Sequence, residues 1–233
     1  MTANAGREPV SEPAAQAGAM FGEALPQARA YARLLTEVGT ERGIVGPSEA
    51  ARIWDRHLLN CGVISRLIPA HCSVVDLGSG AGLPGIVLAI LLPHARVTLV
   101  EPMARRVEFL AECVVALGLS NAEVRRGRGE ELAGELAADV VTSRAVAPLD
   151  KLAGLSAGLA RNGGRVLAIK GASASAELAR ARPTLARLRI TDARVEIARS
   201  SDGAVSATVV TFTVPAHRAS QQGRRASSYR GRG

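Results

Sequence analysis

Hydrophobic and polar positions follow two different patterns along this chain, and the change between them divides its folded part in two. From residue 25 to residue 69, apolar residues recur three and four positions apart, as on one face of an α-helix. From residue 70 to residue 215, short apolar runs alternate with helical segments. We therefore expect an N-terminal helical extension over residues 25–69, followed by an α/β domain over residues 70–215.

Short apolar runs in the second part predict strands, and helical segments separate them. The predicted strands are Ser73–Leu77, Arg96–Glu101, Ala122–Arg126, Asp139–Ser143 and Gly164–Lys170, and the predicted helices are Pro84–Leu92, Met103–Leu117, Leu149–Leu159 and Ser175–Leu188. Because these strands are apolar throughout, they indicate a parallel sheet that is covered on both faces. Two longer runs, at residues 189–198 and 205–214, flank Asp202-Gly203, which is typical of a hairpin turn. The sequence thus predicts a doubly wound, mostly parallel sheet closed by an antiparallel hairpin.

The two ends of the chain have a different composition from the part between them. Residues 1–24 are rich in Ala, Pro, Glu and Gly with no sustained period, so we expect a disordered segment there. Residues 216–233 contain five arginines and no acidic residue, and they account for +5 of the net charge of +8. We expect a basic disordered tail over residues 216–233, which favours a phosphate-rich partner.

Overall composition excludes several classes of protein. A hydrophobic fraction of 47% with 21% charged residues is ordinary for a globular protein. No apolar run approaches the roughly 18 residues of a membrane span. The N-terminus lacks the basic and apolar pattern of a secretory signal. The three cysteines lie far apart, so the sequence predicts neither disulfides nor a metal site, and we expect a cytoplasmic protein.

A glycine-rich turn, VVDLGSGAGLPG, follows the first predicted strand and allows two interpretations. Gly80, Gly82 and Gly85 match the fingerprint that binds the pyrophosphate of a dinucleotide at a helix N-terminus. Gly78, Gly80 and Gly82, with Asp76 before them, instead match the S-adenosyl-L-methionine loop of class I methyltransferases. Both loops need glycine because the backbone turns sharply and approaches the ligand closely.

The surroundings of this turn favour S-adenosyl-L-methionine over NAD. The turn begins at Gly78, two residues before the dinucleotide match. The carboxylate of Asp76 would repel a pyrophosphate, but it suits a ligand that carries ammonium and sulfonium charges. The predicted antiparallel hairpin also resembles the methyltransferase sheet. Glu101 ends the second strand and can accept hydrogen bonds from ribose hydroxyls, which fits either ligand.

Charged or glycine residues follow the predicted strands at their carboxyl ends. In open α/β sheets this edge is where ligands bind. The residues are Asp76 and Gly78, Glu101, Gly129-Glu130, Arg144, and Lys170-Gly171. Each of them alone is consistent with a solvated strand end or a salt bridge. Together they predict one site along the carboxyl edge of the sheet.

Several motifs in order along residues 25–214 resemble the small-subunit ribosomal RNA methyltransferase G family, also called glucose-inhibited division protein B. The matching motifs are WDRHLLN (54–60), DLGSGAGLPG (76–85), Glu101-Pro102 followed by RRVEFL (105–110), Ser143-Arg144-Ala145 and Lys170-Gly171. Asn60 departs from the pattern, since many relatives have aspartate there. The basic tail after Val214 also lies outside the shared pattern.

The resemblance implies a reaction and a set of contacts. Members of the family methylate N7 of a guanine in 16S ribosomal RNA, in the decoding region, with S-adenosyl-L-methionine as cofactor. By the resemblance, Gly78 and Leu83 line the cofactor pocket, Gly129 and Glu130 meet the adenine, and Arg144 lies beside cofactor and substrate as the candidate catalytic residue. Candidates for RNA contacts, from their places in the chain, are Arg56, His57 and Lys170. His57, on an otherwise apolar helix face, is also consistent with a core histidine, and Lys170 with a side chain that faces water.

The residues present suit methylation at N7. Guanine N7 has a lone pair and no proton to lose, so catalysis needs alignment and exclusion of water but no general base. Methylation at C5 of cytosine needs a cysteine nucleophile, usually after a proline, and no cysteine here follows one. A class I methyltransferase with another RNA or small-molecule substrate stays open, as does, less favourably, an NAD-dependent oxidoreductase. We expect a monomer that acts on 16S ribosomal RNA or the small ribosomal subunit.

Overall fold

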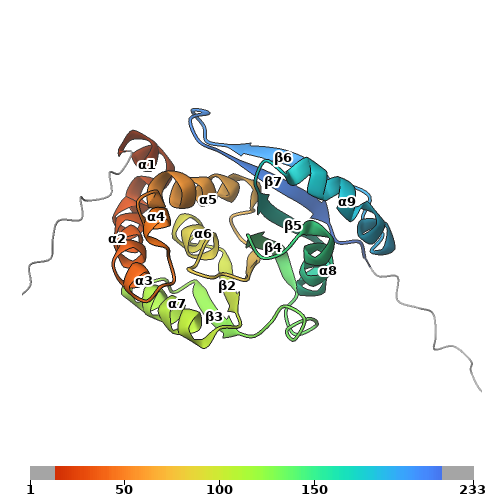
Figure 1. Ribbon diagram of the computed structural model, residues 1–233, viewed down its shortest axis with the longest axis horizontal. Coiled ribbons are helices and arrows are strands. Elements are labelled where there is room, and N and C mark those ends of the chain that lie inside the picture. The colour runs from red at the N-terminus through yellow and green to blue at the C-terminus, as the bar shows by residue number, and fades with distance from the viewer. Residues whose placement is uncertain (1–13, 217–233) are drawn as a thin grey trace, which may run out of the picture.

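A seven-stranded sheet forms the centre of the computed structural model, which describes residues 14–216 (Figure 1). The strands are β1 (Ser73–Leu77), β2 (Arg96–Glu101), β3 (Ala122–Arg126), β4 (Ala138–Arg144), β5 (Ala160–Lys170), β6 (Arg194–Arg199) and β7 (Ser206–Thr213). Their order is β3-β2-β1-β4-β5-β7-β6. The pairs among β1 to β5 are parallel, and β7 runs antiparallel to both of its neighbours, β5 and β6. The predicted α/β sheet with a closing hairpin is confirmed, and three of its strands have the predicted bounds.

Helices cover both faces of this sheet and create two hydrophobic cores. On one face lie α6 (Gly85–Leu91), α7 (Ala104–Ala116) and the N-terminal extension, and on the other lie α8 (Leu149–Leu159) and α9 (Ala174–Arg187) (Figure 1). Neighbouring strand residues belong to different cores: Val74 faces the first and Val75 the second, as Val140 and Val141 do. Both faces of the central strands are buried, which explains why β1 and β4 are mostly apolar, whereas the edge strand β3 contains charged residues.

The N-terminal extension is a chain of short helices. They are α1 (Ala14–Phe21), α2 (Leu25–Thr36), α3 (Val38–Glu41), α4 (Pro47–Ala50) and α5 (Asn60–Gly62), with 3₁₀ turns at Gly22–Ala24 and Val63–Leu67. The segment η2 (Ile53–Leu59) is a π-helical turn, a rare form that is frequent at functional sites. It carries Arg56 and His57 on the side of the extension that joins the sheet domain.

Part of the segment expected to be disordered is folded, so that prediction is wrong for residues 14–24. Ala17 and Phe21 are buried in the first core, and the Phe21 ring packs edge-on against Trp54 with centroids 6.3 Å apart. The alanine-rich composition of this segment gives no clear hydrophobic period, and burial of Ala17 and Phe21 stabilises the helix. Residues 1–13 and the predicted tail from residue 217 onward lie outside the described residues.

Side-chain hydrogen bonds attach the extension to the sheet domain. The hydroxyl of Tyr31, on α2, is fully buried and donates to the carbonyl oxygen of Ala81 at 2.7 Å. Asn60 Nδ2 donates to the carbonyl oxygen of Ser206 on β7 at 3.1 Å. The extension is therefore bound to the domain at the glycine-rich turn and at the far strands.

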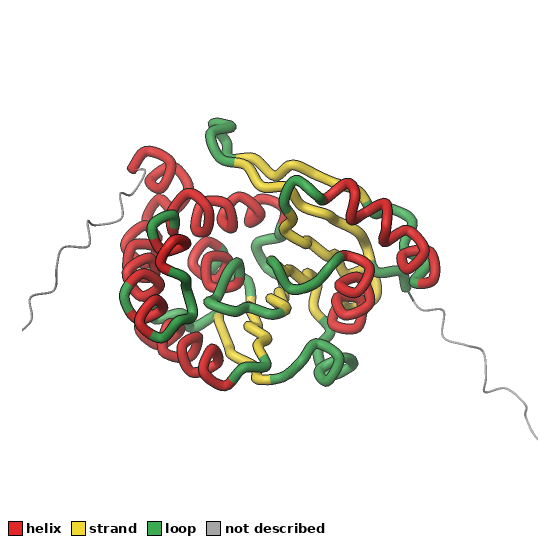
Figure 2. The backbone as a smooth tube through the Cα atoms, viewed as in Figure 1, coloured by secondary structure: helices red, strands yellow, loops and turns green. Residues whose placement is uncertain are grey.

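Two connections lie at the surface of the molecule. The β6–β7 hairpin projects beyond the rest of the sheet, and a loop at residues 127–137 joins β3 to β4 (Figure 2, green). No helix in the described part of the chain is long and apolar enough to span a bilayer.

Gly85 lies where the start of α6 packs against β1 and β2, and Gly85→Ala should destabilise the protein. An added methyl group would overlap the side chains of Leu99 and Asp76. Overpacking of this kind costs about 1–3 kcal/mol of unfolding free energy, measurable by chemical denaturation.

The matched control is Gly154→Ala on α8. A methyl group there meets no atom within 4 Å, and replacing a helical glycine by alanine stabilises by about 0.5–1 kcal/mol. Equal stability of the two variants would contradict the packing described here.

Candidate functional site

The carboxyl ends of the parallel strands form one edge, and two clefts open along it. The first contains Gly78, Glu101, Gly129 and Glu130, and it encloses about 310 Å³. The second, which encloses about 760 Å³, contains Arg56, Asn60, Arg144, Lys170 and Arg180. The segment 145–147 after β4 lines both clefts, so it is the wall between them. The structure thus gathers most of the predicted site residues at the predicted edge.

The glycine-rich turn after β1 has a backbone that glycine alone adopts readily. Gly78, Gly80 and Gly82 have φ angles of +69°, +59° and +99°, which side chains disfavour. A Cβ at Gly82 would also lie 2.7 Å from the Tyr31 hydroxyl oxygen. Leu83 is half-buried and packs against the first core. The turn is therefore shaped by its own glycines and held by the extension.

Asp76 is a buried carboxylic acid next to this turn. Its Oδ2 accepts a hydrogen bond of 2.9 Å from the backbone N–H of Gly85, whereas the buried Oδ1 has no partner. Burial raises the pKa of Asp76 from its ordinary 3.8 to about 7. An unpartnered carboxylate oxygen in such surroundings is costly, so it fits a site that receives a positively charged group.

Glu101 links the end of β2 to the glycine-rich turn. Its Oε2 accepts a 3.0 Å hydrogen bond from the N–H of Gly80, and its Oε1 accepts one of 3.0 Å from Met103. The side chain is only 2% exposed. A carboxylate oxygen has more than one lone pair, so both oxygens can still accept hydrogen bonds from a ligand in the first cleft.

Gly129 and Glu130 lie opposite Glu101 in the first cleft. A Cβ at Gly129 would approach Leu77 Cδ1 to 2.8 Å, so this backbone packs directly on the end of β1. The side chain of Glu130 is exposed. The cleft has apolar walls of Val100, Met103 and Leu155, which suit a flat ring.

A buried ion pair supports the wall between the clefts. Lys170 Nζ donates to the carbonyl oxygen of Ala147 at 2.8 Å and pairs with Glu177 at 2.8 Å. The Lys170 side chain is 8% exposed. In this conformation the ammonium of Lys170 holds the wall, and its phosphate contact stays a prediction.

His57 faces the protein interior, as a core histidine does, and its RNA contact stays a prediction. It is 6% exposed, and its Nδ1 lies 2.6 Å from Nη2 of Arg144. Arg144 Nη1 donates to the sulfur of Cys61 at 3.2 Å. Both of these partners of Arg144 come from the extension. Arg144 itself lines the second cleft.

The exposed cations of the second cleft are Arg56 and Arg180. Arg56 is predicted from the sequence, whereas Arg180 is not, because it lies on α9 in no recognisable motif. Arg180 reaches the cleft because α9 lies beside the end of β5 in the folded protein. A cleft with exposed guanidinium groups attracts phosphate.

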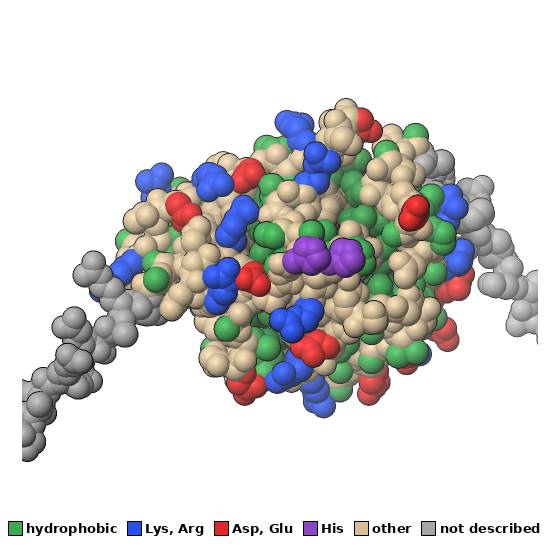
Figure 3. All heavy atoms as spheres, turned by 180° about the vertical axis from the view of Figure 1, so that it is seen from behind, with side chains coloured by type: hydrophobic (Ala, Val, Ile, Leu, Met, Phe, Trp, Pro, Cys, Tyr) green, Lys and Arg blue, Asp and Glu red, His purple; other side chains and the backbone are tan. Residues whose placement is uncertain are grey.

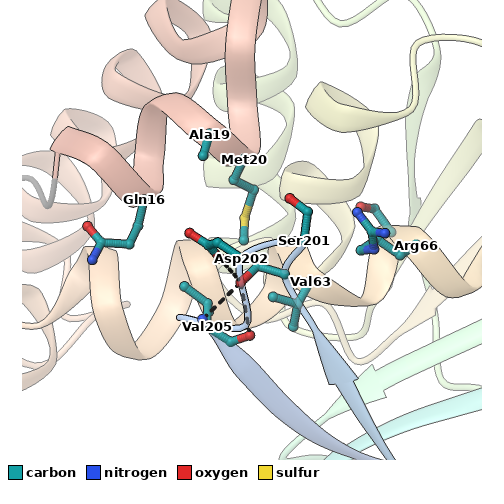
Figure 4. Close-up of a pocket in the computed structure, with 11 residues that line it drawn as sticks. Gln16, Ala19, Met20, Val63, Arg66, Ser201, Asp202 and Val205 are labelled. Carbon is teal, nitrogen blue, oxygen red and sulfur yellow. Dashed lines mark hydrogen bonds between the residues drawn. The ribbon is translucent and has the colours of Figure 1, made fainter.

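Other surface features lie outside this edge. A hollow of about 130 Å³ lies between α1 and the β6–β7 turn, and Met20, Val63 and Asp202 are among the residues that line it (Figure 4). In the turn, the Ser200 hydroxyl donates to Asp202. His71 and His94 stack with centroids 5.1 Å apart on the face seen in Figure 3. Within residues 14–216, no group of three or more His, Cys, Asp and Glu side chains could hold a metal ion.

Comparison with known sequences gives extensive matches. The family described as rRNA small subunit methyltransferase G matches residues 24–204. A "Ribosomal RNA small subunit methyltransferase G" of Thermobifida fusca is 53% identical over 204 residues, which cover 87% of this chain and 85% of that protein. One of the same description from Kineococcus radiotolerans is 46% identical over 203 residues, covering 87% and 80%.

Solved structures with a similar fold share far less sequence. P. horikoshii TYW2, in complex with MeSAdo, has a TM-score of 0.56 at 12% identity and covers 69% of this chain and 63% of that one. A SAM-dependent O-methyltransferase of Thermotoga maritima has a TM-score of 0.54 at 15% identity, covering 68% and 65%. These likenesses establish the class I methyltransferase fold.

Asp76→Asn should stabilise the protein without ligand, and more so at pH 8 than at pH 5. The pKa of Asp76 is raised to about 7 in the folded state, so the stability that its proton confers is complete below about pH 4 and is lost as the pH rises through 7. Asparagine does not titrate and avoids that loss. Thermal unfolding at the two pH values measures the difference.

Asp139→Asn is the control, because the pKa of Asp139 is shifted in the opposite direction to that of Asp76. Hydrogen bonds from Ser73, then from Arg161, lower the pKa of Asp139 to about 2, so its stabilising effect is complete at both pH 5 and pH 8. This variant should lose the same amount of stability at the two values. A pH-independent effect of Asp76→Asn would show that Asp76 titrates normally.

Proposed function

The chain belongs to the rRNA small subunit methyltransferase G family, and from that premise we propose that it transfers a methyl group from S-adenosyl-L-methionine to a guanine of 16S ribosomal RNA. The acceptor that we propose is N7 of a guanine in the decoding region. The observation that carries the proposal is the wall at 145–147, which both clefts share. Cofactor and base can meet there.

The residues of the first cleft and its turn fit S-adenosyl-L-methionine. The unpartnered Oδ1 of Asp76 suits the ammonium end of the cofactor. The backbone at Gly80 borders open space, whereas a Cβ at Gly78 would approach Val146 of the wall to 2.7 Å. Glu101 can accept the ribose hydroxyls, and Gly129-Glu130 borders the space for adenine. When bound, the cofactor supplies a methyl group on a positively charged sulfur.

The second cleft supports a reaction that needs no proton removal. Its one carboxylate, Glu177, pairs with Lys170 and accepts hydrogen bonds from Ser173 and from the N–H of Leu149. Among the described residues that line the cleft, none is a histidine, and no carboxylate is left as a base. Guanine N7 attacks with an existing lone pair, so a cleft without a general base is adequate.

The nearby cysteine is unsuited to nucleophilic catalysis. Cys61 is fully buried, and burial raises its pKa to about 11 even though Arg144 lies beside it. A thiol in that state is not the thiolate that attacks a pyrimidine ring. This favours transfer to a purine nitrogen over transfer to C5 of cytosine.

Arg144 is the residue that we assign to the reacting base. Two of its N–H groups contact His57 and Cys61, and a guanidinium has three more N–H groups that can donate to a ligand. The oxygen next to N7 of guanine accepts such hydrogen bonds, whereas adenine has an amino group in that place. Arg56 and Arg180 then bind phosphates of the same RNA.

NAD is the alternative ligand, and the geometry of Asp76 disfavours it. A pyrophosphate would bind at the N-terminus of α6, but the N–H of Gly85 there already donates to Asp76. A pyrophosphate would also approach a carboxylate.

Methyl transfer to isolated small ribosomal subunits that lack the modification tests the proposal. We expect label from S-adenosyl-L-methionine to appear at N7 of one guanine in the decoding region, which is the acceptor that we propose. S-adenosylhomocysteine should raise the melting temperature, and NAD should not. Label at another atom would refute N7 specificity, and stabilisation by NAD alone would refute the methyltransferase assignment.

Arg180→Ala should weaken binding to small subunits at low salt. Loss of one phosphate contact reduces the slope of log K against log salt by about 0.7–0.9, which salt titration of binding measures.

The matched control is Arg182→Ala, two residues further along α9, since Arg182 is exposed and does not line the cleft. It should leave both affinity and slope close to wild type. Equal effects of the two substitutions would mean that the second cleft is not the RNA site.

A further inference from the structure

Arg144 is held by two groups from a distant part of the chain. Nη2 of Arg144 lies 2.6 Å from Nδ1 of His57, and Nη1 lies 3.2 Å from Sγ of Cys61. His57 and Cys61 are four residues apart at the junction of η2 and α5, so they face the same side. The extension therefore fixes the direction of a guanidinium group that β4 supplies.

Only one form of His57 can hold Arg144. A guanidinium group donates and never accepts, so Nδ1 must carry a lone pair and the imidazole proton must be on Nε2. Nε2 lies 2.7 Å from Oε2 of Glu49, which favours that tautomer. Burial, and then the charge of Arg144, lower the pKa of His57 to about 4. The imidazole is thus neutral near pH 7.

We propose that His57, with its tautomer set by Glu49, is a positioning residue that directs Arg144 toward the second cleft. The inference rests on the proposed function, because it needs Arg144 to meet the substrate. It assigns His57 an indirect role: His57 is 6% exposed and acts through the guanidinium group.

The physical reason is pre-organisation. An arginine side chain has many rotamers, and ordering it costs free energy each time substrate binds. His57 and Cys61 hold two N–H groups in place before the substrate arrives. A shift of about 1 Å in a positioned group can reduce a rate by about a hundredfold, so loss of the His57 acceptor should slow methyl transfer.

Single-turnover methyl transfer to unmethylated small subunits, at saturating S-adenosyl-L-methionine, gives the rate. His57→Leu places an apolar side chain in the buried position and removes the acceptor. We expect the rate to fall by at least about tenfold. His57→Asn places an amide oxygen near the position of Nδ1 and should recover most of the rate. If His57→Asn is as slow as His57→Leu, with both folded, the proposal is overturned.

A double-substitution cycle separates positioning from a general structural role. In an Arg144→Ala background, His57→Leu should cause no further loss of rate, because the group it positions is gone. A further loss of the same size would show that His57 acts elsewhere and would overturn the proposal.

Glu49→Leu provides a second route if His57→Leu does not fold. Glu49 has 37% of its side chain exposed, so the substitution should be tolerated. Without the carboxylate the His57 proton can move to Nδ1, where it opposes Arg144. We expect a partial loss of rate that also disappears in the Arg144→Ala background, and persistence of the loss there would overturn the inference.

The wild-type reaction separates the two proposals. If the wild type places no methyl group on guanine N7, the proposed function fails. If the wild type does so and the cycle is additive, the proposed function stands and the role of His57 fails.

Discussion

The hydrogen bond between Asp76 and the N–H of Gly85 is the constraint on which the site depends. It joins the end of β1 to the first residue of α6 across a turn of three left-handed glycines. Gly85 has no side chain, so the helix can approach the strand closely. A fully buried carboxylate is the cost of this arrangement, and its remaining oxygen has no partner. The turn is thereby stable in shape yet electrostatically incomplete, which is the condition of a binding site prepared for a cation.

Much of the fold was evident in the sequence because burial on both faces leaves a clear pattern. The bounds of β1, β2 and β3 agree with the predicted strands, since each is a short segment around valine residues that turns or helices interrupt on both sides. Residues 14–24 were misjudged because alanine and glycine have little pattern of their own, and Phe21 becomes informative only beside Trp54. The glycine-rich turn and Glu101 were found for a similar reason: their geometry is local, so it leaves a local motif.

The roles of His57, Lys170 and Arg180 depend on contacts between distant segments, and the sequence could not supply them. His57 and Arg144 are 87 residues apart, and Lys170 meets a backbone oxygen of a loop 23 residues earlier. A cation at the end of a strand is equally consistent with a ligand contact and with an internal support. What decides between these roles is exposure, which the fold determines. In this structure two of the predicted RNA contacts, His57 and Lys170, are buried and support neighbouring residues.

The wall at 145–147 has a consequence for how the two ligands communicate. Its Ala145 has a φ of +56°, an unfavourable conformation for alanine, and Lys170 holds its Ala147 at the other end. A ligand in the first cleft and a ligand in the second would therefore contact the same three residues. If binding on one side shifts this segment, each ligand must alter the affinity of the other by the same factor. Coupling of this kind would pass through residues 145–147.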